Sequence, residues 1–258
     1  MSSATRLLGR KALVTGSSKG IGRGIAVRLA QEGADVAINY YSDPKGADQA
    51  LAEVLALGRK GVAIQADTGS VEAVRDLVTR SAEALGGLDV LVNNAGIEHE
   101  APFWDVTEQH YDRVVDVNLK GVFFGTQAFV RHCRAAGHGG KVINISSVHE
   151  DLAFPNFAAY CASKGGLRML ARTLAIELGP LGITINNIAP GAIETPMNAK
   201  LLNDPAKLGA LTRQIPLARL GTTTDVAGLA VFLASADSDY VTGSTYFVDG
   251  GLTVFYTE

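Results

Sequence analysis

Two side chains with the spacing of an acid–base pair, Tyr160 and Lys164, stand four residues apart in the sequence. On a helix they would project from one face. A phenol with an ordinary pKa of about 10 is a poor acid–base catalyst at neutral pH, and a neighbouring ammonium favours its ionised form. Ser147, thirteen residues before the tyrosine, ends a strand-like run over 141–147 and could hold a substrate oxygen beside the phenol. These residue types predict proton transfer at a hydroxyl or carbonyl group, the alternative being that Tyr160 and Lys164 are ordinary helix-surface residues.

The size and composition of the chain indicate one domain of the α/β class. The 258 residues are within the range that such folds occupy as a single domain. Of these residues 47% are apolar, 19% are charged and 29 are glycine, which suits a large core with helices covering a sheet. We therefore predict a doubly wound, Rossmann-type parallel sheet of seven strands with helices on both faces, in a single domain over residues 1–258.

The charge pattern and the cysteines exclude several other classes. The net charge is −3 and the basic residues are scattered, so we expect neither a nucleic acid nor a membrane as partner. Cys133 and Cys161 show no metal-ligand spacing and no secretory segment precedes them, which predicts a cytoplasmic protein without a metal site. The longest apolar stretch, around 226–236, is too short to cross a bilayer. A small molecule is the expected substrate.

Short apolar or β-branched runs alternate with longer segments of helical period from residue 11 onward, as in βαβ units. Strands are predicted over 11–15, 35–40, 61–66, 88–93, 140–146, 182–189 and 244–248, and helices over 20–32, 44–57, 70–85, 107–135, 156–178 and 223–235. Asp43, Ser70 and Thr107 are the expected N-caps of three of these helices. The segment 195–215 has prolines around a short helical stretch and is interpreted as a substrate-covering flap. Ligands of such a fold belong at the carboxyl ends of the strands.

A glycine-rich loop joins the first predicted strand to the first predicted helix over residues 15–22, T-G-S-S-K-G-I-G. Glycines at 16, 20 and 22 allow a tight turn and a close approach of the backbone to a pyrophosphate, whose charge the helix N-terminus attracts. The loop predicts a dinucleotide site, although glycines also occur at helix-entry turns for steric reasons alone.

Five motifs in order along the chain resemble those of the short-chain dehydrogenase/reductase family. They are T-G-x-x-x-G-x-G at 15–22, N-N-A-G at 93–96, an asparagine at 118, a serine thirteen residues before Y-x-x-x-K, and P-G-x-x-x-T at 190–195. The resemblance covers nearly the whole chain and implies catalytic roles for Asn118, Ser147, Tyr160 and Lys164. The family's spacing favours Ser147 over Ser146. The asparagine is expected to hold a water that joins the lysine to solvent, whereas a mid-helix asparagine otherwise indicates a mild bend.

The same resemblance implies how a nicotinamide dinucleotide would bind. Ile193 and Thr195 would orient the nicotinamide carboxamide, and Asp67 aligns with the residue that accepts from the adenine amino group in relatives. The alternative role of Asp67 is to cap the following helix. The expected cofactor-binding residues are Gly16, Ser18, Lys19, Gly20, Ile21, Gly22, Asp67, Asn94, Ala95, Gly96, Tyr160, Lys164, Pro190, Gly191, Ile193 and Thr195.

The end of the second predicted strand bears on the choice between NAD and NADP. An NAD enzyme usually has a carboxylate there to bind the ribose hydroxyls. Here residues 38–42 read I-N-Y-Y-S, and the next carboxylate, Asp43, is better interpreted as a helix cap. Lys19 could pair with a 2′-phosphate, to which Ser18 and Ser42 could donate. We therefore predict NADP, with NAD also accepted, the alternative being that Lys19 is simply solvated.

Longer stretches of the sequence, above all residues 142–150, V-I-N-I-S-S-V-H-E, are similar to the bacterial glucose 1-dehydrogenases. Glu98, His149 and, on the flap, Asn198 could satisfy sugar hydroxyls, although polar residues in such loops are usually just hydrated. The resemblance implies oxidation of the C1 hydroxyl of an aldose such as D-glucose to the lactone. The alternatives are an NADPH-dependent carbonyl reductase, including the 3-oxoacyl-carrier-protein type, and a catalytically silent dinucleotide sensor.

The last segment of the chain, over 248–256, is apolar. Relatives in the family bury this region between the subunits of a tetramer, so the resemblance implies a homotetramer. The alternative is an edge strand packed on its own core.

Overall fold

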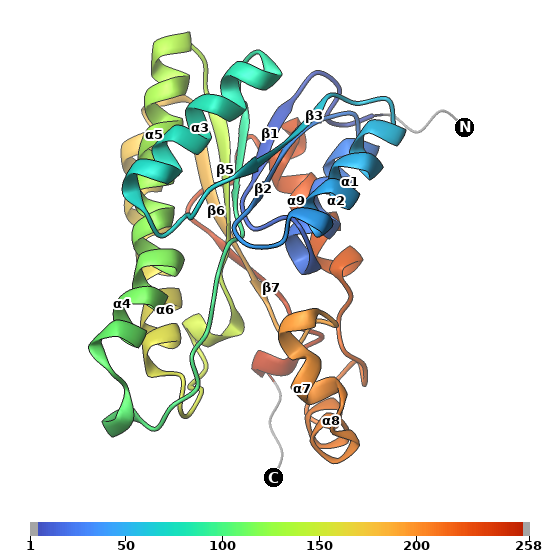
Figure 1. Ribbon diagram of the computed structural model, residues 1–258, viewed down its shortest axis with the longest axis vertical. Coiled ribbons are helices and arrows are strands. Elements are labelled where there is room, and N and C mark those ends of the chain that lie inside the picture. The colour runs from blue at the N-terminus through green and yellow to red at the C-terminus, as the bar shows by residue number, and fades with distance from the viewer. Residues whose placement is uncertain (1–4, 255–258) are drawn as a thin grey trace.

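A single seven-stranded sheet forms the centre of the computed structural model, which describes residues 5–254 (Figure 1). The strands are β1 (Lys11–Val14), β2 (Asp35–Tyr40), β3 (Gly61–Gln65), β4 (Val90–Asn93), β5 (Gly140–Ile145), β6 (Ile183–Pro190) and β7 (Thr245–Val248). They pair in parallel in the order β3-β2-β1-β4-β5-β6-β7. The order reverses between β1 and β4, where sheets of this kind bind ligands. The predicted doubly wound sheet of seven strands is confirmed.

Helices cover both faces of this sheet, with α1, α2 and α9 on one side and α3, α5 and α6 on the other (Figure 1). The helices are α1 (Gly20–Gln31), α2 (Pro44–Ala56), α3 (Val71–Leu85), α4 (Glu108–Val115), α5 (Gly121–Ala136), α6 (Ala158–Leu178), α7 (Ala199–Leu202), α8 (Pro205–Thr212) and α9 (Thr223–Ala234). The predicted caps Asp43, Ser70 and Thr107 each accept a hydrogen bond from the first turn of their helix. The helical segment predicted over 107–135 is helical over 108–136, and a π-helical turn, Asp116–Lys120, lies within it between α4 and α5.

Neighbouring residues of the central strands enter opposite cores. On β4, Val92 packs in the core beneath α1 and α9, whereas Leu91 packs in the core beneath α3 and α5. Ile143 and Val142 of β5 divide in the same way. All four side chains are at most 1% exposed. Because both faces are covered, these strands need apolar residues at every position, which explains their continuous hydrophobic sequence.

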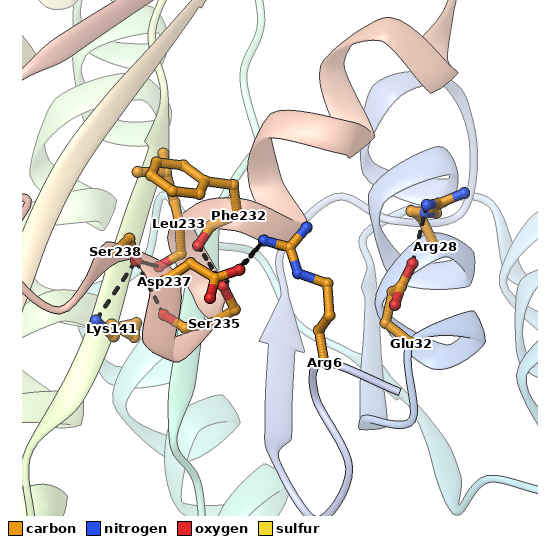
Figure 2. A network of polar contacts seen from close by, with 9 residues as sticks. All are labelled: Arg6, Arg28, Glu32, Lys141, Phe232, Leu233, Ser235, Asp237 and Ser238. Atoms are coloured by element: carbon orange, nitrogen blue, oxygen red, sulfur yellow. Dashed lines mark hydrogen bonds and ion pairs between the residues drawn. The ribbon is translucent and has the colours of Figure 1, made fainter. Parts of the chain in front are cut away.

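Polar contacts fasten the N-terminal segment and β5 to the turn that follows α9 (Figure 2). Arg6 pairs with Asp237 in this turn. The buried Lys141 near the start of β5 lies 2.7 Å from Asp239 and 3.5 Å from the Ser238 hydroxyl. These contacts lie at the amino-terminal end of β5, opposite the ligand-binding edge, so they stabilise the scaffold without entering the site.

A close approach at Gly121 positions the start of α5. A methyl group at Gly121 would lie 2.0 Å from the carbonyl oxygen of Thr68, in the loop after β3. No larger residue fits without a shift of the backbone. The contact fixes the preceding π-helical segment, which contains Asn118, relative to the end of β3.

Gly121→Ala should therefore lower the free energy of unfolding by about 2 kcal/mol or more, because the added methyl group overpacks against a main-chain oxygen. Gly228→Ala, on α9, is the matched control, since no atom lies within 4 Å of its added methyl group. It should raise the same quantity by about 0.5–1 kcal/mol through helix propensity. Urea denaturation followed by circular dichroism measures both, and equal effects of the two substitutions would show that the approach at Gly121 is not tight.

Candidate active site

The structure brings Ser147, Tyr160 and Lys164 together just beyond the carboxyl end of β5. Ser147 follows β5 directly, and its hydroxyl lies close enough to the Tyr160 phenol to act on the pKa of the phenol. Lys164 lies one turn after Tyr160 on α6, with Nζ 5.5 Å from the centroid of the tyrosine ring. Its ammonium donates to the carbonyl oxygen of Ile145 at 2.9 Å. A phenol, a hydroxyl and an ammonium thus share one buried corner of the sheet edge.

Ser146, the competing candidate, has a structural contact instead. Its hydroxyl donates to the carbonyl oxygen of Ile188 on β6 at 3.2 Å. Ser147 accepts from the amide of His149 at 3.1 Å, which starts the short turn Val148–Glu150. The geometry therefore favours Ser147 as the hydroxyl beside the phenol.

The pKa values of this cluster differ from the sequence-based expectation. Burial raises the pKa of Tyr160 to about 12, against the opposing effect of the hydrogen bond with Ser147. Burial lowers the pKa of Lys164 to about 8. Burial is the largest effect on the phenol in the free chain, so the expected role of Lys164 in making the phenol acidic stays a prediction. At neutral pH Tyr160 is protonated and Lys164 is charged.

A buried carboxylate, Glu150, lies near Lys164. Its side chain is 0% exposed, and Oε1 lies 3.7 Å from Nε of Arg168 on α6. Neither of its oxygens has a hydrogen-bond partner among residues 5–254. Its negative charge opposes the effect of burial on the pKa of Lys164 and so helps to keep the ammonium charged. The sequence predicts no role for Glu150, and its position three residues after Ser147 is the signal that could have indicated one.

Asn118 lies in the π-helical segment and is fully buried. Its amide donates to the carbonyl oxygen of Ile97 at 2.8 Å and to the Ser163 hydroxyl at 3.2 Å, and its oxygen accepts from the Ile97 amide at 2.9 Å. These contacts hold the loop after β4 against α6. Asn118 thus has a positioning role in the structure, and the water expected beside it stays a prediction.

The glycine-rich loop packs directly on the N-N-A-G segment after β4. Gly16 has a φ of +60°, and a methyl group there would lie 2.9 Å from the Ala95 Cα. A methyl group at Gly22 would lie 2.4 Å from the Asn94 amide nitrogen. That nitrogen donates to the carbonyl oxygens of Thr15 and Gly16 at 2.8 and 3.0 Å. Side chains at these glycines would displace the loop, which supports the interpretation of a backbone cradle at the N-terminus of α1.

A cavity of about 380 Å³ extends from the glycine-rich loop to Tyr160. All sixteen residues expected to bind the cofactor line it, and so does Ser147. The lining does not include Asn118, Glu98, His149 or Asn198. The residues present therefore fit a dinucleotide that lies across the glycine-rich loop with one end at the phenol.

The three candidate substrate residues lie in different settings. Burial and, less strongly, the charge of Glu100 raise the pKa of Glu98. The charge of Glu98 in turn raises the pKa of Tyr160. The His149 ring lies 6.3 Å from the Tyr160 ring, and burial lowers its pKa. Asn198 donates to a backbone carbonyl at 2.7 Å. His149 therefore neighbours the Tyr160 ring and Glu98 acts on the phenol through its charge, whereas the Asn198 amide is engaged within the segment that follows β6.

Comparison with known proteins agrees with this geometry. A family model described as Enoyl-(Acyl carrier protein) reductase matches residues 16–253. The chain belongs to the short-chain dehydrogenase/reductase family. Solved structures of this family have the seven-stranded parallel sheet found here. The chain is therefore an oxidoreductase of this family.

The names of individual relatives of this chain indicate different substrates. The chain is 44% identical to 3beta-hydroxysteroid dehydrogenase 1 of Eggerthella lenta, covering 96% of this chain and 95% of that protein. It is 41% identical to glucose 1-dehydrogenase 2 of Bacillus subtilis, covering 98% of both. A crystal structure of gluconate 5-dehydrogenase from Burkholderia cenocepacia with NADP and tartrate matches with a TM-score of 0.92 and 40% identity, over 98% of both chains.

Two further findings concern residues 5–254. No helix in this range is long and apolar enough to cross a membrane. Within the same residues, no group of three or more His, Cys, Asp or Glu side chains could hold a metal ion. Cys133 and Cys161 are both free thiols, and burial raises the pKa of Cys133 to about 12, which makes it a poor nucleophile.

Lys164→Met should remove a pH dependence of stability. The pKa of Lys164 in the folded chain, about 8, lies below its unfolded value of about 10.4. Burying the charged ammonium therefore costs free energy below pH 8, and this cost disappears as both states lose the proton towards pH 10.5. Relative to the variant, the free energy of unfolding of the wild type should rise by ~3 kcal/mol between these limits.

Urea denaturation at several pH values between 7 and 10.5 measures this difference. Lys207→Met is the matched control, because Lys207 has a side chain that is 78% exposed and keeps its ammonium in water. Its difference from the wild type should stay constant with pH. A constant difference for Lys164→Met as well would contradict burial of a charged lysine.

Proposed function

We propose that this protein is an NADP-dependent dehydrogenase that oxidises the C1 hydroxyl of an aldose such as D-glucose to the lactone. The convergence of Ser147, Tyr160 and Lys164 at the end of the dinucleotide cavity carries the proposal. His149, whose ring lies 6.3 Å from the Tyr160 ring, and Glu98, whose charge acts on the phenol, offer polar groups for sugar hydroxyls. A relative that is 41% identical is a glucose 1-dehydrogenase, which agrees with a sugar substrate.

The cofactor assignment follows from the lining of the cavity. The glycine-rich loop at the N-terminus of α1 would hold the pyrophosphate, Lys164 the nicotinamide ribose, and Ile193 with Thr195 the carboxamide. Lys19 in that loop would attract the 2′-phosphate, and the related gluconate 5-dehydrogenase was crystallised with NADP. The proposed cofactor is therefore NADP, and we expect the protein to accept NAD as well.

The proposed reaction depends on where the proton of the sugar hydroxyl goes. Ser147 holds the C1 hydroxyl oxygen, and ionised Tyr160 takes its proton while the C1 hydrogen leaves as hydride. When bound, the oxidised nicotinamide supplies the hydride acceptor at C4 and a positive charge near the phenol. Together with the ammonium of Lys164, that charge offsets the burial that holds the pKa of Tyr160 at about 12. Tyr160 thus becomes a base in the complex.

Carbonyl reduction is the second candidate, and the raised pKa of Tyr160 favours it. A protonated phenol at neutral pH can donate directly to the oxygen of a ketone. An acyl-carrier protein would need basic residues at the mouth of the site, and Arg131 lies instead in a groove between α3 and α5 with Arg75. A small ketone is therefore the better carbonyl substrate. A silent sensor would not need the acid–base cluster.

The segment after β6 and the subunit arrangement complete the proposal. Within the flap proposed over 195–215, Pro196 and Met197 line the cavity, so this segment would cover a bound substrate.

We propose a homotetramer in the cytoplasm. The exposed apolar side chains Phe247 and Val254 in the C-terminal segment favour contact with another subunit, although residues 255 and 256 of the predicted apolar segment 248–256 lie outside the described residues.

A substrate panel tests the reaction. Purified protein is mixed with NADP or NAD and with a set of aldoses, secondary alcohols and steroids. The absorbance of the reduced nicotinamide at 340 nm should rise with an aldose. Oxidation of NADPH in the presence of ketones tests the second candidate. Absence of turnover with every compound would support the sensor and end both enzymatic proposals.

Tyr160→Phe tests the proton carrier. The variant should lower kcat/KM by about 10²–10⁴-fold, because proton transfer is lost, while the Kd for NADP, measured by calorimetry, stays within about twofold. Tyr111→Phe, on the exposed side of α4, is the matched control and should retain full activity. Retained activity in Tyr160→Phe would assign the proton transfer to another residue.

A further inference from the structure

The cavity has a second end, on the far side of the glycine-rich loop from Tyr160. Tyr41 and Ser42 from the loop after β2, Asp67 from the loop after β3, and Arg113 from α4 line this end. With the pyrophosphate at the N-terminus of α1 and the nicotinamide at the phenol, the adenosine half of the cofactor falls here. The role derived below for Arg113 rests on the proposed dinucleotide function.

Arg113 reaches this end of the cavity from α4 and is held there by two contacts. Nη1 lies 2.9 and 3.1 Å from the two carboxylate oxygens of Asp67. The guanidinium carbon lies 5.4 Å from the centroid of the Tyr41 ring. Gly69 leaves room for this arrangement, because a methyl group there would lie 2.6 Å from Nη1. A carboxylate and an aromatic ring on separate elements thus fix the guanidinium at the cavity wall.

The charges at this end decide whether a 2′-phosphate is tolerated. The cavity wall there has the carboxylates of Asp43 and Asp67 and the cations of Lys19 and Arg113. A ribose phosphate has between one and two negative charges at neutral pH, so an unpaired Asp67 carboxylate would repel it. Arg113 cancels the charge of Asp67. NAD has a hydroxyl in place of this phosphate and gains little from the cancellation.

The end of β2 makes this pairing more important. Residues 39–42, N-Y-Y-S, include no basic side chain that could pair with a phosphate on the ribose. Lys19 is then the single cation on the glycine-rich loop, and it would face two carboxylates if Arg113 were absent. We propose that Arg113 is a specificity-determining residue for NADP, which acts by neutralising Asp67 at the adenosine end of the cavity.

Cofactor binding to Arg113→Gln tests this role. Calorimetry with NADP and with NAD should show an NADP Kd about tenfold weaker than that of the wild type and an NAD Kd within about twofold. Raising the ionic strength from about 0.05 to 0.5 M should narrow the difference between the wild type and the variant, because the effect is electrostatic. The ratio of the two affinities corrects for any fraction of the variant that does not fold.

Arg75→Gln is the matched control. Arg75 on α3 also has a hydrogen bond, to Gln127 at 3.2 Å, and a contact with an aromatic ring, Phe124, at 5.1 Å. It lines a groove that shares none of the cofactor-binding residues. The ratio of NADP to NAD affinity should be unchanged in this variant. The control therefore separates the loss of any one positive charge from the loss of the positive charge that pairs with Asp67.

The double variant Asp67→Asn with Arg113→Gln separates neutralisation from direct phosphate contact. Removing both charges should restore most of the wild-type ratio of NADP to NAD affinity. A double variant as deficient as Arg113→Gln, or an equal loss of NADP and NAD affinity in the single variant, would overturn the proposed role. A wild-type protein that binds neither cofactor would instead refute the dinucleotide function itself, and this role with it.

Discussion

Burial of a phenol and an ammonium in one corner is the physical constraint on which the site depends. Burial is the largest cause that raises the pKa of Tyr160 to about 12 and lowers that of Lys164 to about 8, and both shifts oppose the charged forms that base catalysis needs. The fold offsets part of this cost. The carbonyl oxygen of Ile145 accepts from the ammonium, and the buried Glu150 favours its charged form. The free chain therefore holds the lysine charged but leaves the tyrosine protonated.

This imbalance gives the cofactor a second role in the proposed oxidation. A site whose phenol were already ionised would hold a buried anion whenever the nicotinamide was absent, which is costly in a dry environment. In the proposed oxidation the base would form only when positive charge is added beside it. Reduction of a carbonyl needs the opposite state, a protonated phenol, which the chain has at neutral pH. One residue can thus serve both directions because the cofactor's charge differs between them.

The sequence predicted the elements whose physics is local or repetitive. Strands buried on both faces read as continuous apolar runs, and Ser70 and Thr107 were recognisable caps because their side chains act within one turn. The π-helical segment at 116–120 was missed, since its extra residue per turn follows from the contacts of Asn118 with Ile97 and Ser163 rather than from propensity. Tertiary contacts override the local pattern there.

The candidate site was predictable where backbone geometry dictates the residue type, and less so where side chains of distant elements meet. Glycines at 16 and 22 are required by packing on Asn94 and Ala95, so their spacing was a strong signal. The pairing of Arg113 with Asp67 joins residues 46 positions apart, and no local rule links them. The pKa shifts were also hidden, because the spacing of Tyr160 and Lys164 predicts their proximity but not the desolvation that dominates both.

Substrate choice in this fold falls to the segments that follow the strands, which explains why close relatives act on a steroid, a sugar and a sugar acid. Three such segments meet around the phenol. The amide of Ala101, after β4, donates to the carbonyl oxygen of Asn156, before α6, at 2.9 Å. Lys200 on α7 lies 3.9 Å from Glu100 in the first of these segments. The corner proposed for catalysis is built from the end of β5 and from α6, whereas the walls above it are loops joined by a few polar contacts, so these loops could change with substrate without disturbing the proposed chemistry.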